Sequence, residues 1–149
     1  MDFFRFDNNI ADMEKDAIRL VIADDHPIIR MSIRFLLETN PKYVVVGEAE
    51  NGLHAVSLVQ KLQPDVILLD INMPVLDGIQ AARIISSRFP KTKVVILTMH
   101  DDPAYAQWAI KAGACSVLLK GCGRDEILDA IWCNARMRQN EPLAVTEPA

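Results

Sequence analysis

The sequence predicts an open α/β fold, in which a parallel five-stranded sheet carries helices on both faces. Five short apolar runs rich in β-branched residues have the unbroken character of strands buried on both sides. They are LVIAD, YVVVGE, DVILLD, KVVILT and SVLLK. Segments with helical spacing of apolar residues separate these runs. Because crossovers between parallel strands are right-handed, this alternation predicts a three-layer sandwich. At 149 residues, half of them apolar, the chain has the size of one compact domain.

The five helices are predicted from the residues that begin them. Pro27 suits a first helical turn, and Ile29 and Ile33 behind it lie one turn apart. Candidate N-caps precede the next three helices: Asn51, Asp77, and Asp101 or Asp102 before Pro103. The fifth helix is expected from about residue 125 to residue 138.

The predicted domain covers residues 18–138, and the two ends of the chain differ from it in composition. Residues 1–17 mix charged residues with Phe3, Phe4 and Phe6, so we expect a flexible extension whose aromatic residues have the chemistry to dock elsewhere. Residues 139–149 show no periodicity and contain prolines, which is typical of a flexible tail or the start of a linker to a further domain.

Composition excludes several classes of protein. The N-terminus has no signal peptide, and no run of about 18 apolar residues occurs, so we expect a soluble cytoplasmic protein without a membrane segment. A net charge of −4 without a Lys/Arg cluster argues against direct nucleic-acid binding. Cys115, Cys122 and Cys133 lack the spacing of a zinc site, which favours reduced thiols.

Polar residues stand at the ends of four of the predicted strands. Asp24 and Asp25 follow the first strand, and Asp70 ends the third. Thr98 ends the fourth strand and Lys120 the fifth. In a flavodoxin-like sheet of order 2-1-3-4-5, the first and third strands are neighbours at the topological switch point, so we expect three carboxylates to meet at one edge.

Such a cluster needs a compensating cation. Oxygen ligands suit Mg²⁺ or Mn²⁺, and Lys120 adds a positive charge. A cation beside a carboxylate, with Lys and Thr donors facing the same point, is the apparatus for phosphoryl transfer, with Asp70 as the acceptor. Each residue alone also suits an ordinary role in a turn, a cap or the surface; the combination on one edge favours the phosphoryl site.

Four motifs carry a resemblance to a known family. They are ADDHP (23–27), LLDINMPVLDG (68–78), LTMHDD (97–102) and GACSVLLK (113–120). Over about residues 19–138 the chain resembles the receiver domain of two-component response regulators, of the LuxR/NarL/FixJ type, whose output is usually a helix-turn-helix. The resemblance implies the CheY-like form of the fold predicted above. The turn residues Met73, Pro74 and Gly78 also match the family.

The resemblance implies a role for each polar residue. Asp70 would accept a phosphoryl group from a sensor histidine kinase. Asp24, Asp25, Asp70 and the backbone carbonyl of Asn72 would hold Mg²⁺ or Mn²⁺, while Thr98 and Lys120 would contact the phosphoryl group. Such a protein is no enzyme beyond its own phosphorylation and dephosphorylation. It would control transcription through an output domain outside this chain, and pair with a second copy through its last two helices and fifth strand.

Several residues depart from the family pattern or modify it. Val117 stands where the family often has an aromatic switch residue, and Gly121 stands where many members have a cis-proline, so we expect a trans bond there. His100, with Asn72, resembles positions that influence the lifetime of the phosphoryl group; Met99 is a further candidate modulator.

Three other large side chains allow two interpretations each. His26 is expected at the rim of the pocket as a packing residue rather than a metal ligand. Trp108 lies in an apolar stripe of the fourth helix and Trp132 in one of the fifth. Both suit core packing and also an interface between proteins.

Other function classes remain open at this point. A haloacid-dehalogenase-like phosphatase would place a second acid two residues after the nucleophile, where this chain has Asn72. A flavodoxin-like cofactor binder would want a Ser/Thr/Gly-rich phosphate loop in place of ADDHP. A stand-alone receiver that acts as an interaction module would keep the fold.

Overall fold

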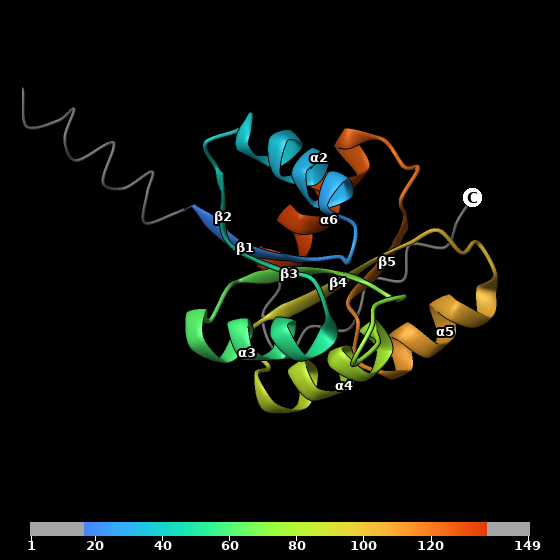
Figure 1. Ribbon diagram of the computed structural model, residues 1–149. Helices are drawn as coiled ribbons and strands as arrows, with labels where there is room; N and C mark the ends of the chain where they lie inside the picture. Colours follow the sequence, from blue (N-terminus) through green and yellow to red (C-terminus); the bar gives the residue numbers. More distant parts are fainter. Residues whose placement is uncertain (1–16, 137–149) are drawn as a thin grey trace, which may run out of the picture.

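The computed structural model describes residues 17–136, which form a three-layer α/β sandwich (Figure 1). Five parallel strands make one sheet of order β2-β1-β3-β4-β5, as predicted. The strands are β1 (Ile18–Ala23), β2 (Tyr43–Ala49), β3 (Val66–Asp70), β4 (Lys93–Thr98) and β5 (Ser116–Leu119). The helices are α2 (Pro27–Glu38), α3 (Gly52–Leu62), α4 (Gly78–Arg88), α5 (Pro103–Lys111) and α6 (Arg124–Arg136).

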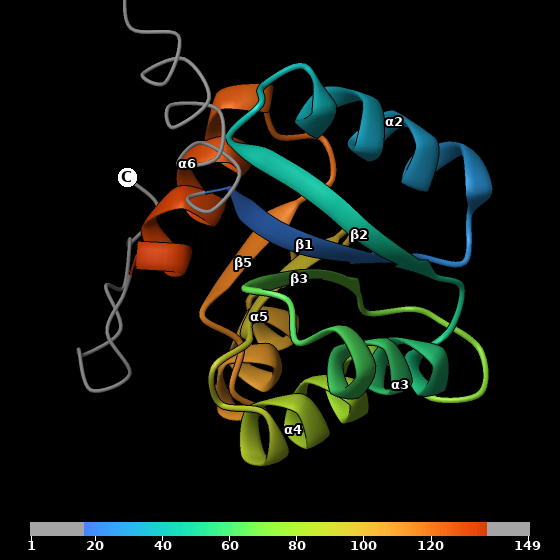
Figure 2. The same cartoon turned by 90° about the vertical axis from the view of Figure 1, so that its left-hand side faces the viewer.

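The helices divide between the two faces of the sheet. Helices α2 and α6 cover one face, and α3, α4 and α5 cover the other (Figure 2). Alternate residues of β1 enter different cores, because successive side chains of a strand point to opposite faces. Leu20 packs with Ile33 of α2, whereas Val21 packs with Val59 of α3. All five residues of β3 are buried, which explains its unbroken apolar run.

The predicted N-caps begin three of the helices. Asn51 Oδ1 accepts a hydrogen bond from the His54 backbone amide at 2.8 Å, and Asp77 Oδ1 accepts one from Gln80 at 2.8 Å. Asp102, and not Asp101, caps α5. These caps fix where each helix starts, and so set the length of the loops at the carboxyl edge of the sheet.

The turn between β3 and α4 brings the helix close to the end of the strand. The Gly78 backbone amide donates to the Ile71 carbonyl at 2.8 Å. A Cβ at position 78 would collide with the Asp70 carbonyl oxygen, so only glycine allows this approach. The turn therefore fixes the position of Asp70 at the carboxyl end of β3.

Some expectations fall outside the described residues. These are the flexible extension over residues 1–16, the docking of Phe3, Phe4 and Phe6, the tail over 139–149 and the last two residues of the predicted fifth helix. Within residues 17–136 no peptide bond is cis, in agreement with the trans bond expected at Gly121.

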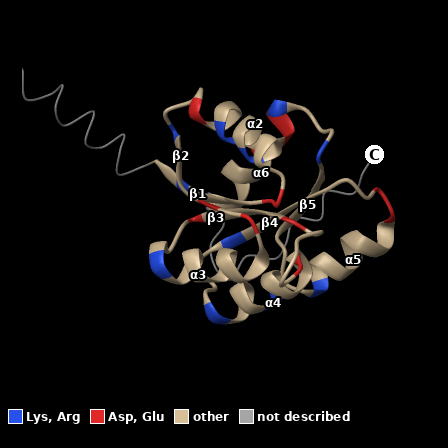
Figure 3. Cartoon of the chain, viewed as in Figure 1, with Lys and Arg blue, Asp and Glu red and all other residues tan. Residues whose placement is uncertain are grey.

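Two further observations concern the described surface. None of the helices described is long and apolar enough to cross a membrane. Lys and Arg positions are spread over several helices and loops rather than gathered on one face (Figure 3).

Candidate functional site

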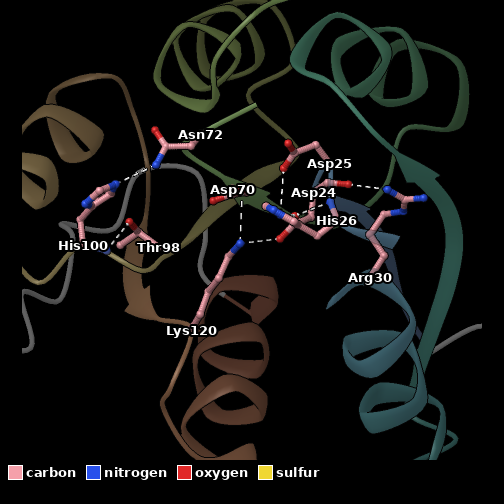
Figure 4. A network of polar contacts seen from close by, with 9 residues as sticks. All are labelled: Asp24, Asp25, His26, Arg30, Asp70, Asn72, Thr98, His100 and Lys120. Carbon is pink, nitrogen blue, oxygen red and sulfur yellow. Dashed lines mark hydrogen bonds and ion pairs between the residues drawn. The ribbon is translucent and has the colours of Figure 1, made fainter. Parts of the chain in front are cut away.

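The polar residues predicted at the strand ends lie on one edge of the sheet. Asp24 and Asp25 follow β1, Asp70 ends β3 beside it, Thr98 ends β4, and Lys120 directly follows β5 (Figure 4). A backbone hydrogen bond of 2.8 Å from the Lys120 amide to the Thr98 carbonyl ties the last two together. Four loops distant in sequence therefore build one site at the topological switch point.

Lys120 joins the carboxylates of β1 and β3. Its Nζ lies 2.6 Å from Asp24 Oδ2 and 3.3 Å from Asp70 Oδ2. The three side chains are only 8%, 2% and 6% exposed, so this is a buried ion cluster with more negative than positive charge. Burial of unbalanced charge is costly, which favours a further cation in this place.

The pKa values of the two carboxylates are shifted in opposite directions. Burial alone would raise the pKa of Asp24, but its hydrogen bonds from Lys120 and His26 outweigh burial and lower that pKa below its usual value. Burial also raises the pKa of Asp70, and the negative charge of Asp24 adds to this; Lys120 only partly offsets both. Asp70 is thus the carboxylate that gains most from a nearby positive charge.

His26 completes the acidic cluster in an unexpected way. Its backbone amide donates to Asp24 Oδ1 at 2.9 Å, and its ring Nδ1 lies 3.0 Å from the same oxygen. Nδ1 also lies 3.0 Å from Asp25 Oδ1, but without hydrogen-bond geometry. The sequence predicted His26 at the rim, and its side chain is indeed 62% exposed, yet its ring nitrogen faces the carboxylates.

The donor set fits a divalent cation. One ligand atom from each of Asp24, Asp25, His26 and Asp70 lies within 4.8 Å of the others. Asp25 Oδ1 is buried and has no hydrogen-bond donor among the described residues. A carboxylate oxygen left without a donor beside two further carboxylates has the chemistry of a hard-cation ligand such as one for Mg²⁺.

Arg30 supports the site from below and was missed by the sequence interpretation. Its Nη1 donates to the Asp24 backbone carbonyl at 2.5 Å, and its Nε lies 3.5 Å from Glu48 Oε1 of β2. Arg30 thereby fixes the loop that carries both aspartates to the first turn of α2. Its position one turn after His26 was the only available signal.

Residues of the β3–α4 and β4–α5 loops form one side of the site. The Thr98 hydroxyl is buried and accepts a hydrogen bond from the His100 backbone amide at 3.0 Å. The exposed Asn72 side chain contacts the His100 ring, with Nδ2 2.7 Å from Nε2 (Figure 4). Asn72 and His100, which the sequence linked through the resemblance, are therefore in direct contact.

The two other candidate modulators pack toward opposite faces of the sheet. Met99 is 72% exposed and lines an apolar cavity of about 330 Å³ together with Ile29 and Leu36 of α2. Val117 is partly buried and packs on the opposite face, against the core below α3, α4 and α5. Met99 thus shares a cavity with Lys120 of the polar cluster, whereas Val117 belongs to the other core.

Comparison with known proteins agrees with this geometry. The model of the response regulator receiver domain matches residues 20–132. The transcriptional regulatory protein DegU of Brevibacillus brevis is 40% identical over 119 residues, which cover 80% of this chain and 50% of DegU. YxjL of Bacillus subtilis (strain 168), a transcriptional regulatory protein, is 43% identical over 124 residues, covering 83% of this chain and 57% of YxjL.

Solved structures show the same likeness. The signal receiver domain of NarL from Mycobacterium tuberculosis superposes with a TM-score of 0.79 at 38% identity, and the match covers 83% of this chain and 99% of that domain. The response regulator domain of Thermotoga maritima CheB gives a TM-score of 0.76 at 30% identity, covering 82% and 98% of the two chains.

A parallel sheet of order 2-1-3-4-5 with buried acids and a lysine at its switch point is the architecture of a receiver domain. The chain belongs to the receiver-domain family of two-component response regulators, and its relatives are of the NarL and DegU type. It spans 50–60% of the length of the curated relatives DegU, YxjL and NarL.

Proposed function

We propose that this domain accepts a phosphoryl group on Asp70 from the phosphohistidine of a sensor kinase. The observation that carries the proposal is the burial of Asp70 with its Oδ2 3.3 Å from Lys120 Nζ. A carboxylate oxygen of Asp70 also lies within 4.8 Å of one from Asp24 and one from Asp25. An oxygen of the Asp70 carboxylate attacks phosphorus; the new P–O bond forms as the P–N bond breaks, and the electron pair leaves with the imidazole nitrogen.

The residues around Asp70 would each meet part of the incoming charge. Lys120 already bridges two carboxylates, so its ammonium can turn to a phosphoryl oxygen without leaving the site. The Thr98 hydroxyl sits at the end of the neighbouring strand; its oxygen accepts from the His100 amide, and its own proton can be donated to the phosphoryl group. Both donors lie in a buried place, where a charge-assisted hydrogen bond is strongest.

Asp24, Asp25 and Asp70, with the backbone carbonyl of Asn72, would hold Mg²⁺ or Mn²⁺. The bound cation would neutralise the negative charge that gathers on the phosphoryl oxygens. His26 and Arg30 would hold the loop that carries the two aspartates. His26 contacts Asp24 Oδ1, and Arg30 contacts the Asp24 backbone carbonyl. In this role the two residues orient ligands and do not touch the phosphoryl group.

The readout surface would be α5, β5 and α6. Pulling Thr98 and its loop toward a phosphoryl group would bias the position of α5, which begins five residues later. Trp108 of this surface is 52% exposed, which suits contact with a second copy of the domain. We propose that residues 18–138 form the receiver domain. In a longer protein, pairing of two receiver domains would control transcription through an output domain.

Mass measurement tests the acceptor directly. Intact protein is incubated with acetyl phosphate and Mg²⁺, and the wild type is compared with Asp70→Ala and with Asp129→Asn, which removes an exposed acid of α6. We expect the wild type and Asp129→Asn to gain one phosphoryl group, and Asp70→Ala to gain none. Equal labelling of Asp70→Ala would refute the assignment.

Two outcomes would favour other function classes. A wild type that stays unlabelled while its fold is intact would favour a pure interaction module. Continuous release of phosphate at many turnovers per molecule would favour an aspartyl-phosphate phosphatase, although the residue two after Asp70 is the amide Asn72 rather than an acid.

A further inference from the structure

An aromatic residue of α5 reaches the rim of the site through His100. The His100 and Tyr105 rings are stacked, with their centroids 4.3 Å apart and their planes 9° apart. On its other side, Tyr105 meets Trp108 edge to face at 5.3 Å. Together with the 2.7 Å contact between Asn72 and His100, this gives a continuous chain of side chains from the β3–α4 loop to α5.

The stack restricts the His100 ring from two directions. Asn72 Nδ2 carries only protons to donate, so His100 Nε2 accepts the hydrogen bond. The Tyr105 ring stacks on one face of the His100 ring and limits its rotation. The backbone of His100 is fixed as well, since its amide donates to the Thr98 hydroxyl. Without the Tyr105 ring, His100 would keep its backbone position but regain side-chain rotamers.

The position of this ring matters for access to Asp70. Asn72 lies two residues after Asp70, and His100 lies two residues after Thr98, on the neighbouring strand. Their contact bridges the two loops on this side of the carboxylate (Figure 4). A water molecule entering between these two loops would meet the bridged pair before Asp70.

We propose that Tyr105 is a positioning residue that holds His100 against Asn72 and thereby slows hydrolysis of the phosphoryl group. The inference rests on the proposed phosphorylation of Asp70. In hydrolysis, a water oxygen attacks phosphorus and the bond to the Asp70 carboxylate oxygen breaks, so that inorganic phosphate leaves and Asp70 is restored. Tyr105 acts on this step only through the ring it positions.

Dephosphorylation rates test the proposal. The wild type, Tyr105→Leu and Tyr105→Phe are labelled with acetyl phosphate and Mg²⁺, the donor is removed, and loss of the phosphoryl group is followed by intact mass. We expect Tyr105→Leu to lose it about two- to tenfold faster, the range that one aromatic stack supplies, and Tyr105→Phe to match the wild type because the ring remains.

A double variant separates positioning from general damage to the fold. In the His100→Ala background, Tyr105→Leu should add no further acceleration, because the residue it positions is gone. An additive effect there, an unchanged rate in Tyr105→Leu, or equal acceleration in Tyr105→Phe would each overturn the proposal.

A measurement on the unphosphorylated protein keeps this test apart from that of the proposed function. The ring protons of His100 should show a ring-current shift in the NMR spectrum of the wild type and Tyr105→Phe, and lose it in Tyr105→Leu. Persistence of the shift in Tyr105→Leu overturns the positioning role. Failure of the wild type to take up phosphate instead overturns the proposed function, and the hydrolytic role of Tyr105 with it.

Discussion

The surroundings of Asp70 disfavour the ionised form of its carboxyl group. Its side chain is 6% exposed and faces a second buried carboxylate, and a single ammonium lies between them. Burial and Asp24 raise the pKa of Asp70, which means that ionised Asp70 destabilises the fold. In the proposed function, this same arrangement makes Asp70 the carboxylate that gains most from a bound cation.

Replacing Asp70 by asparagine should therefore stabilise the metal-free protein. In a chelator at neutral pH, Asp70→Asn should raise the free energy of unfolding by about 1 kcal/mol, because it removes a poorly compensated buried charge and leaves Lys120 paired with Asp24. Urea unfolding measures this, with the exposed Asp129→Asn as the control. A less stable Asp70→Asn would contradict the account of the charge cluster.

Asp25 allows the metal site to be tested separately from the acceptor. Mg²⁺ at 100 times its dissociation constant should stabilise the wild type by about 2.7 kcal/mol. Asp25→Asn should fold normally, because Asp25 Oδ1 accepts no hydrogen bond and its one ionic neighbour, His26, is 62% exposed, but it should lose most of this Mg²⁺ effect. Thermal unfolding with and without Mg²⁺ measures both. An unchanged Mg²⁺ response in Asp25→Asn would place the cation elsewhere.

The sequence predicted which polar residues meet but not how they are oriented. Asp24, Asp70 and Lys120 follow buried strands, so strand order alone brings them to one edge. The positions of the His26 ring beside Asp24 and of Tyr105 on His100 depend on loop paths and rotamers. No period or motif in the chain encodes these two positions.

Among the elements, the β3–α4 connection determines the geometry of the site most directly. It starts after Asp70 and ends at the Asp77 cap and Gly78, whose amide donates to the Ile71 carbonyl. Val75, inside the connection, has a positive φ of 71°, a strained conformation for a β-branched residue. Helix α4 is thus docked against the strand end at the cost of local backbone strain.

Gly78→Ala should expose this constraint. The added methyl group would meet the Asp70 carbonyl, so the backbone must shift, and we expect a loss of about 2 kcal/mol or more of stability together with slower phosphorylation. Gly121→Ala is a matched control, since nothing lies within 4 Å of its Cβ, and it should change stability by less than about 0.5 kcal/mol. Equal effects of the two substitutions in urea unfolding would argue against the close approach.

The start of each element was predictable where a local interaction defines it. Asn51 and Asp77 cap their helices through side-chain oxygens three residues from the bonded amide, a pattern visible in sequence. The exposure of the Trp108 side chain was not predictable, because it depends on which face of α5 meets the sheet. In the structure Ala109 lies on the buried face of α5, and Trp108 is 52% exposed.

Among residues 17–136, exposed large apolar side chains occur on both sides of the sheet, on α2 and on α5 with β5. The α2 surface contains Ile28, Met31 and Phe35. The surface of α5 and β5 contains Trp108, Ile110 and Leu119. The α2 surface meets the site through Arg30, which contacts the Asp24 carbonyl. The α5 surface is joined to it by a chain of side chains, Tyr105, His100 and Asn72. A change at Asp70 therefore has a direct route to the surface of α5 and β5.

This difference predicts which surface pairs on phosphorylation. In sedimentation velocity with acetyl phosphate and Mg²⁺, the wild type should shift from monomer toward dimer. Trp108→Arg should remain a monomer at equal phosphorylated fraction, because a buried unpaired charge at an interface costs several kcal/mol. Phe35→Arg, which places the same charge at a 75% exposed position on α2, should still form the dimer. If Phe35→Arg abolished pairing while Trp108→Arg did not, α2 would be the dimer surface, and the contact chain from Asn72 to Trp108 would not carry the signal.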